Sequence, residues 1–213
     1  MHRQNATIWH ERPVWIALGC NDRGAWGAPE QALATAILKM RASGLEIKII
    51  SDVYVTAAIG GGRQPDYLNA VIGVRSHLAP AALLRLLKRL ERQAGRRLGR
   101  HWGPRPLDLD IVAFGPANGR SGAGPRRQGQ VILPHPEMHR RAFVLVPLAQ
   151  VAPFWWHPVL HRSVRQLLEG EAVRRQRRGV RRLMPLAHIL PSQVLDEALS
   201  LPSTNAGKVG WQP

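Results

Sequence analysis

The alternation of hydrophobic and polar residues along the chain predicts strands and helices in succession. Short apolar or alternating runs predict strands, and apolar residues three or four positions apart predict helices. The expected strands are 14–18, 46–56, 66–74 and 107–114, and the expected helices are 29–42, 80–94, 144–151 and 164–168. Their order begins β-α-β-β-α-β, which is typical of the α+β class. We therefore predict a ferredoxin-like sandwich, in which helices pack on one face of an antiparallel sheet.

Length and composition indicate how the chain divides into domains. Its 213 residues, 45% of them hydrophobic, are enough for one domain with additional segments or for two small domains. We assign the core domain to 14–169, with an N-terminal extension over 1–13 and a basic C-terminal tail over 170–213. Residues 116–130 are rich in Gly, Pro and Arg and are expected to form a flexible insertion. From 185 onward the tail is expected to be loosely attached, with one short helix over 192–199.

Several kinds of protein are excluded by what the sequence lacks. Cys20 is the single cysteine, which excludes a disulfide framework and a cysteine-rich zinc site. No apolar run approaches the roughly 18 residues that a membrane-spanning helix needs. The start of the chain contains no apolar core of a secretory signal. We therefore expect a cytoplasmic protein with no membrane partner.

The charge of the chain is strongly basic. There are 30 Lys and Arg residues against 14 Asp and Glu, a formal charge of +16. Such a charge indicates an acidic partner, which is a nucleic acid, an anionic lipid or a polyphosphate. Half of the excess lies in 116–130 and 171–182, outside the expected core. These segments are either a nucleic-acid or membrane arm or a solvated surface, and we favour the surface because charge alone indicates function weakly.

Two acidic residues stand out in the strand expected over 107–114. Because side chains alternate along a strand, the leucines and the isoleucine of this run share one face. Asp108 and Asp110 share the other face, about 6.6 Å apart by backbone rise. Like charges held side by side repel each other, and Mg²⁺ completed by waters and substrate phosphates would compensate them. The alternative is an edge strand whose acidic residues simply face solvent.

A glycine-rich basic loop over 95–106 comes directly before the acidic pair. Its guanidinium groups, on Arg96, Arg97, Arg100 and Arg105, match phosphate oxygens. Its glycines would let the loop move over a ligand. A basic loop beside paired carboxylates favours phosphoryl chemistry, because phosphate charge is neutralised on one side and a metal is held on the other.

Four blocks of the sequence follow one another in a characteristic order, namely 17–21 (ALGCN), 64–70 (QPDYLNA), 102–111 (WGPRPLDLDI) and 133–148 (LPHPEMHRRAFVLVPL). Together they resemble the 6-hydroxymethyl-7,8-dihydropterin pyrophosphokinase family of folate biosynthesis, and the resemblance spans about 14–169. It implies a ferredoxin-like fold and transfer of pyrophosphate from ATP to the hydroxymethyl group of a reduced pterin. The products would be the pterin diphosphate and AMP, and the cofactor would be Mg²⁺, as two ions.

The same resemblance implies roles for individual residues. Metal binding falls to Asp108 and Asp110, which are also implied as catalytic together with Arg96 and Arg105. Asp108 is further implied to accept or orient the proton of the pterin hydroxyl. The ATP side is implied to include Glu91, Arg96, Trp102, Arg105, Ile111, His135 and Arg141, and the pterin side Thr56, Tyr67, Asn69 and Phe143.

The pterin residues have a chemical case of their own. Tyr67 and Asn69 are two positions apart and therefore point from the same face of a strand. An asparagine amide offers a donor and an acceptor together, which suits the edge of a pterin. Tyr67 and Phe143 could hold a flat heterocycle by stacking, and core packing is the alternative for both.

The sequence departs from the family pattern at a few positions. Cys20 replaces a serine, Ala57 and Ala58 replace a proline-rich pair, and Leu98 and His101 replace arginines. These changes concern loop affinity and movement and leave the carboxylate pair in place. We expect ATP and a reduced hydroxymethylpterin as partners, no nucleic acid, and a monomer or weak oligomer.

An alternative interpretation is a ferredoxin-like nucleic-acid-binding module that uses the Arg-rich segments. The acidic pair argues against it, because carboxylates on the sheet would repel a phosphate backbone in the absence of metal. On the enzyme interpretation, removal of 170–213 is expected to leave turnover largely intact.

Overall fold

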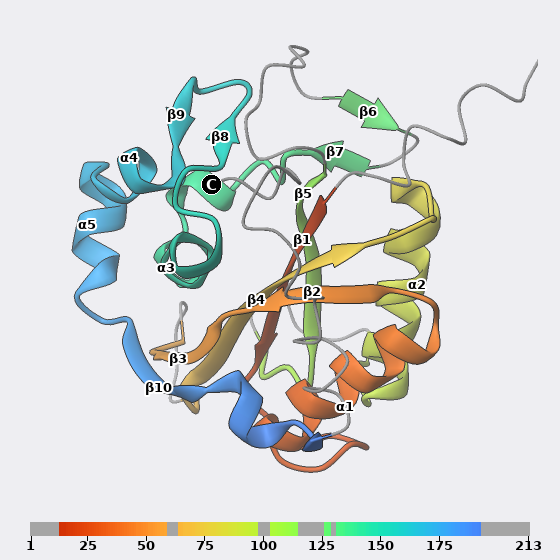
Figure 1. Cartoon of the computed structure of the whole chain (residues 1–213). Coiled ribbons are helices and arrows are strands. Elements are labelled where there is room, and N and C mark those ends of the chain that lie inside the picture. The colour runs from red at the N-terminus through yellow and green to blue at the C-terminus, as the bar shows by residue number, and fades with distance from the viewer. Residues whose placement is uncertain (1–12, 59–63, 98–102, 115–125, 129–130, 193–213) are drawn as a thin grey trace, which may run out of the picture.

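The computed structural model describes residues 13–58, 64–97, 103–114, 126–128 and 131–192. Its centre is a six-stranded antiparallel sheet with strand order β10-β3-β4-β1-β5, and β2 also pairs with β4 (Figure 1). The strands are β1 (Pro13–Cys20), β2 (Glu46–Ile50), β3 (Asp52–Thr56), β4 (Tyr67–Arg75), β5 (Asp108–Phe114) and β10 (Arg181–Pro185). The antiparallel sheet and its helices confirm the predicted α+β, ferredoxin-like class.

Helices cover parts of both faces of this sheet. The helices α1 (Pro29–Ala42) and α2 (Pro80–Gln93) pack on one face, and α3 (Ala142–Val151), α4 (Val164–Leu168) and α5 (Glu171–Arg177) lie on the other side (Figure 1). The expectation of helices on one face differs from this arrangement because β1 is apolar on both sides. Val14 and Ile16 join the core with α1 and α2, whereas Trp15 joins the core with α3.

The strand expected over 46–56 is divided into β2 and β3 at Ser51. The Ser51 side chain is buried, and its Oγ accepts a hydrogen bond from the Val71 amide at 2.9 Å. The same hydroxyl donates to the Asp52 carbonyl at 2.7 Å. A side-chain hydroxyl thus takes a place in the backbone ladder, which interrupts the strand without leaving a buried polar group unpaired.

The C-terminal part of the chain packs against the domain more closely than the sequence indicates. Val173 in α5 is buried beside α3, and β10 adds a strand to the sheet next to β3. Arg182 of β10 forms an ion pair with Asp52 of β3. A 3-10 helix, Leu186–Ile189, follows and buries Leu186 completely. Residues 185–190 are therefore part of the packed structure, and removal of 170–213 would take β10 from the sheet and Val173 from the core.

Other expected segments fall partly outside the described residues. Within the expected insertion over 116–130, β6 (Arg126–Gln128) pairs with β7 (Val131–Leu133), and the remainder is not described. The extension over 1–12 and nearly all of the helix expected over 192–199 also lie outside the described residues. Over the ranges that are described, no helix combines the length and hydropathy needed to cross a bilayer.

A buried histidine makes the stability of the fold depend on pH. His157, in the hairpin of β8 (Trp156–His157) and β9 (Arg162–Ser163), accepts hydrogen bonds at Nδ1 from the Val159 and Leu160 amides, at 3.3 and 3.2 Å. Burial, reinforced by the nearby His139, lowers the pKa of His157 from 6.5 to about 4. The folded protein therefore keeps this imidazole neutral at pH values where the unfolded chain binds a proton.

We expect the thermal unfolding temperature to decrease as the pH is lowered from 6.5 to 4, since the stabilisation from a neutral His157 is complete only above the pKa of the unfolded state. The loss below pH 4 is expected to be on the order of 3 kcal/mol. In His157→Asn, which retains an acceptor but does not titrate, this part of the pH dependence should disappear. The exposed His188→Asn is the matched control, and an unchanged slope in His157→Asn would contradict the assignment.

Candidate active site

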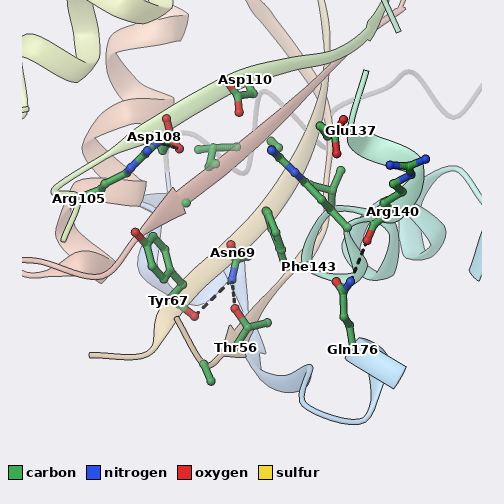
Figure 2. A pocket seen from close by; sticks show the side chains of 16 residues that line it. Thr56, Tyr67, Asn69, Arg105, Asp108, Asp110, Glu137, Arg140, Phe143 and Gln176 are labelled. Atoms are coloured by element: carbon green, nitrogen blue, oxygen red, sulfur yellow. Dashed lines mark hydrogen bonds and ion pairs between the residues drawn. The ribbon is translucent and has the colours of Figure 1, made fainter. Parts of the chain in front are cut away.

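A cavity of about 370 Å³ opens on the face of the sheet opposite α1 and α2. Figure 2 shows side chains from the sheet, from α3 and from the turn before it converging on this cavity. Its volume lies within the range of small-molecule sites, about 300–1,000 Å³. It is lined by eight of the residues to which the resemblance gives a role, namely Thr56, Tyr67, Asn69, Arg105, Asp108, Asp110, Arg141 and Phe143.

The strand register explains how residues from three strands meet there. On β1, which lies between β4 and β5, Gly19 is paired with Asn69 of β4 on one side and with Asp108 of β5 on the other. Ala17, two positions earlier, is paired with Asp110. Paired residues of an antiparallel sheet point to the same face. The small side chains of β1 therefore form a floor that leaves space between the amide on β4 and the carboxylates on β5.

One end of the cavity combines an amide with two aromatic rings. Asn69 is buried, and its Nδ2 donates to Thr56 Oγ1 at 2.9 Å and to the Tyr67 carbonyl at 3.3 Å. Figure 2 shows Tyr67 and Phe143 on either side of Asn69. Burial raises the pKa of the Tyr67 phenol above its usual value of 10.0, so this ring is neutral at physiological pH. The arrangement suits a flat heterocycle with a polar edge.

The other end of the cavity holds the paired carboxylates of β5. Each oxygen of Asp108 accepts a hydrogen bond from an arginine at 2.5 Å, Oδ1 from Arg96 Nη1 and Oδ2 from Arg105 Nη1. Burial alone would raise the pKa of Asp108, but the two arginines and Lys88 outweigh it and hold the pKa below 3.8. Asp108 is therefore an anion at neutral pH, compensated by the chain's own cations.

Lys88 is a member of this network that the sequence analysis missed. Its Nζ lies 2.6 Å from Glu91 Oε1, 2.9 Å from the Leu109 carbonyl and 3.4 Å from Asp110 Oδ1. Lys88 and Glu91 are three residues apart on α2 and therefore share a face of the helix. The one available signal was a basic residue on the helix face next to Glu91.

Glu91 joins α2 to β5, the strand of the paired carboxylates. The side chain is almost fully buried; Oε1 accepts from the Leu109 amide at 2.7 Å and Oε2 pairs with Arg96 Nη1 at 2.6 Å. Burial raises the pKa of Glu91, and the cations around it oppose the rise. Glu91 thus fixes the strand and the arginine together, while its implied contact with nucleotide stays a prediction.

Local backbone geometry places the two arginines against Asp108. Gly95 ends the turn after α2 with a φ of 101°, which side chains other than glycine rarely adopt, and the chain then brings Arg96 back over β5. Arg105 is held by Asn21, whose Oδ1 accepts from the Arg105 amide at 2.8 Å. Asn21 Nδ2 donates to the Pro65 carbonyl at 3.0 Å, which ties this loop to the approach to β4.

The remaining residues implied on the ATP side are placed differently. Arg141 lies against Phe143, with its Cζ 5.8 Å from the ring centre. The His135 amide donates to the Val112 carbonyl at 2.8 Å, and burial lowers the pKa of the His135 imidazole although Asp110 lies near it. The Ile111 side chain is packed in the core with α1 and α2, so its main chain is the part available to a nucleotide. Trp102 lies outside the described residues.

The chemistry of the donor set fits Mg²⁺. Two carboxylates on one strand face supply hard oxygen ligands and leave coordination positions for water and phosphate oxygens, which Mg²⁺ prefers. The described ranges contain no cluster of three or more His, Cys, Asp or Glu residues that could form an all-protein metal site. Binding through two carboxylates plus a phosphorylated substrate is therefore the mode that these residues support.

The chain is similar in sequence to one protein family and to several named proteins. A model of the 7,8-dihydro-6-hydroxymethylpterin-pyrophosphokinase (HPPK) family matches residues 15–153. A Synechocystis protein named 2-amino-4-hydroxy-6-hydroxymethyldihydropteridine pyrophosphokinase is 39% identical over 127 residues, which cover 60% of this chain and 61% of that protein. A Haemophilus influenzae protein of the same name is 35% identical over 140 residues, covering 65% of this chain and 81% of that protein.

Solved structures share the fold. The crystal structure of wild-type Plasmodium falciparum HPPK-DHPS aligns with a TM-score of 0.55 at 14% identity, over 80% of this chain and 47% of that chain. A structure described as HPPK-DHPS in complex with substrates aligns with a TM-score of 0.57 at 13% identity, over 81% of this chain and 48% of that chain. At these identities the likeness shows a common architecture.

Proposed function

The chain belongs to the 7,8-dihydro-6-hydroxymethylpterin-pyrophosphokinase family, and we propose that it transfers pyrophosphate from ATP to the hydroxymethyl group of 6-hydroxymethyl-7,8-dihydropterin. The observation that carries this proposal is one cavity in which an amide and two aromatic rings adjoin a carboxylate pair surrounded by arginines. The reaction would serve the synthesis of folate or of a related pterin cofactor. ATP and the reduced pterin are the proposed partners, and we propose a cytoplasmic monomer or weak oligomer.

In the proposed reaction, the hydroxyl oxygen of the pterin attacks the β-phosphorus of ATP. The bond from this phosphorus to the oxygen that bridges it to the α-phosphorus breaks, and AMP leaves with that bond's electron pair. The pterin hydroxyl loses its proton to the surrounding water. Because the pKa of Asp108 lies below 3.8, Asp108 is a weak base, and we assign it to orienting the hydroxyl and not to storing its proton.

The cations of the site supply the charge neutralisation that this chemistry requires. Bound Mg²⁺, proposed as two ions held by Asp108 and Asp110, would neutralise the phosphate oxygens and hold the triphosphate in line for attack. Arg96 and Arg105 each donate a hydrogen bond to an oxygen of Asp108. When phosphate arrives, both guanidinium groups can exchange the carboxylate for phosphate oxygens, which frees Asp108 as a ligand.

At the pterin end, the side chains orient the substrate. Thr56 and the Tyr67 carbonyl fix the Asn69 Nδ2 group, so the amide has one orientation when the heterocycle enters. Tyr67 and Phe143 would bracket the ring, and Asn69 would pair with its polar edge. The pterin hydroxymethyl group would then point from β4 across Gly19 toward Asp108, where the triphosphate is held.

The decisive test is the reaction itself. The purified chain, supplied with ATP, Mg²⁺ and 6-hydroxymethyl-7,8-dihydropterin, is expected to form AMP and the pterin diphosphate in equal amounts, as measured by chromatography. Chelation of Mg²⁺ with EDTA should stop turnover, and added Mg²⁺ should restore it, because the paired carboxylates alone repel a triphosphate. Formation of ADP in place of AMP, or turnover that survives chelation, would contradict the proposal.

A further inference from the structure

Gln176, in helix α5, forms hydrogen bonds with the backbone of the turn that places Arg141 at the cavity. Its Nε2 donates to the Arg140 carbonyl at 3.0 Å, and its Oε1 accepts from the Ala142 amide at 3.2 Å. These two bonds lie on either side of Arg141. The side-chain amide therefore holds this residue in the way that a neighbouring strand holds its partner, through one donor and one acceptor.

Arg141 lies at a junction where the backbone changes conformation. A 3-10 helix, Met138–Arg140, ends before it and α3 begins after it at Ala142. Arg141 itself is extended, with φ of −111° and ψ of 103°, and its side chain makes no capping hydrogen bond to α3. The first amide groups of a helix lack partners within the helix. Gln176 supplies one for Ala142 and so fixes both the start of α3 and the conformation of Arg141.

The position of α5 is itself determined by packing. Val173, one turn before Gln176, is buried in the core that α3 shares with the sheet. Gln176 is exposed, and together with Arg140, Arg141 and Phe143 it lines the cavity (Figure 2). The family model matches 15–153. This support for the cavity therefore comes from a segment outside the part of the chain that the family model matches.

We propose that Gln176 is a positioning residue for the transfer reaction, which makes α5 part of the functional unit. By fixing the backbone of Arg141, it sets where the guanidinium of Arg141 meets the triphosphate and where Phe143, two residues later, meets the pterin. The inference rests on the proposed function for the identity of those ligands. Its structural basis, two hydrogen bonds that flank a cavity residue, is independent of that identity.

The test compares two variants with the same replacement on the same helix. Gln176→Met keeps the length of the side chain and removes both hydrogen bonds. Arg175→Met is the matched control, because Arg175 is exposed and pairs with Glu171 on its own helix. For each variant we would measure kcat, the KM values for ATP and pterin, the affinity for a non-hydrolysable ATP analogue, the hydrogen exchange of the Ala142 amide and the unfolding temperature.

We expect Gln176→Met to bind the ATP analogue roughly three- to tenfold more weakly and to lower kcat about tenfold, because each lost hydrogen bond loosens the placement of Arg141. Exchange of the Ala142 amide should accelerate. The unfolding temperature should stay near that of the wild type, since Gln176 is exposed. Arg175→Met should match the wild type in every measurement.

Two results would overturn the inference. One is a Gln176→Met variant with wild-type kcat, KM values and analogue affinity, whatever happens to its unfolding temperature. The other is an equal loss in Arg175→Met, which would assign the effect to the charge of α5. A wild-type chain that forms no pterin diphosphate would contradict the proposed function instead, and the analogue affinities and the Ala142 exchange of the two variants would still decide this inference.

Discussion

Replacing either carboxylate of the pair, in Asp108→Asn or Asp110→Asn, is expected to reduce pyrophosphoryl transfer by about 10³-fold or more. Asparagine keeps the size of the side chain and one acceptor oxygen but loses the charge that would hold Mg²⁺. At Asp108 it also loses the anion that Arg96 and Arg105 share. The measurement is AMP formation at saturating ATP and pterin over a series of Mg²⁺ concentrations.

A matched control separates loss of chemistry from loss of charge in general. Asp66 precedes β4, with a side chain that is 54% exposed, and among the described residues it forms a distant pair with Arg181 at 3.9 Å. Asp66→Asn should therefore turn over like the wild type. Circular dichroism should show that all three variants are folded, because the core beneath β5 is formed by Leu109 and Ile111 on the opposite face. Wild-type turnover in either carboxylate variant would overturn the metal assignment.

The features that could be predicted from the sequence are those set by local geometry. The period of two in a strand places Asp108 and Asp110 together, and it places Tyr67 and Asn69 together, without any knowledge of the sheet. The structure adds the register, in which Gly19 and Ala17 of β1 separate the two groups across the floor of the cavity. The small residues at these positions were part of a quoted block, but their pairing partners could not be read from it.

The features that could not be predicted depend on contacts between distant parts of the chain. Gln176 reaches the cavity because Val173 is buried beside α3, a contact that no periodicity in a seven-residue basic helix reveals. Lys88 is one of several basic residues on α2, and its place between Glu91 and Asp110 follows from how that helix packs on β5. In both cases tertiary packing determines where a charged or polar side chain lies. Composition alone would assign both residues to a solvated surface.

The electrostatics of the site follow from the same packing. Lys88, Arg96 and Arg105 converge on carboxylates that would otherwise repel each other at the edge of the cavity. These pairs let the carboxylates be partly buried, because each desolvated charge has a hydrogen-bonded partner. The same cations are groups that a triphosphate would attract. On the proposed function, triphosphate binding would therefore be coupled to release of the Asp108 oxygens.

The second large effect is expected at the other end of the cavity, in Asn69→Leu. Leucine preserves the approximate volume and removes the amide, whose Oδ1 would accept a hydrogen bond from the pterin edge while its Nδ2 is held by Thr56 and the Tyr67 carbonyl. A site that leaves a buried polar edge of its ligand unpaired discriminates strongly against it, so we expect the KM for pterin to rise roughly 10- to 100-fold. The KM for ATP should change less than about twofold, because substitutions at sites that do not contact each other usually have independent effects, and Asn69 lies at the other end of the cavity from the carboxylate pair.

A graded variant tests whether orientation of the amide matters. Thr56→Val removes the hydroxyl that accepts from Asn69 Nδ2 but keeps the amide itself, so its pterin KM should rise less than that of Asn69→Leu. An equal rise in the KM for ATP in Asn69→Leu, or no rise in the KM for pterin, would place the pterin elsewhere. Asn69 of β4, Gly19 of β1 and Asp108 of β5 lie side by side across the three strands. If the Asn69 variant loses only pterin binding and the Asp108 variant loses transfer, the two results together would place the substrate along this line of the sheet.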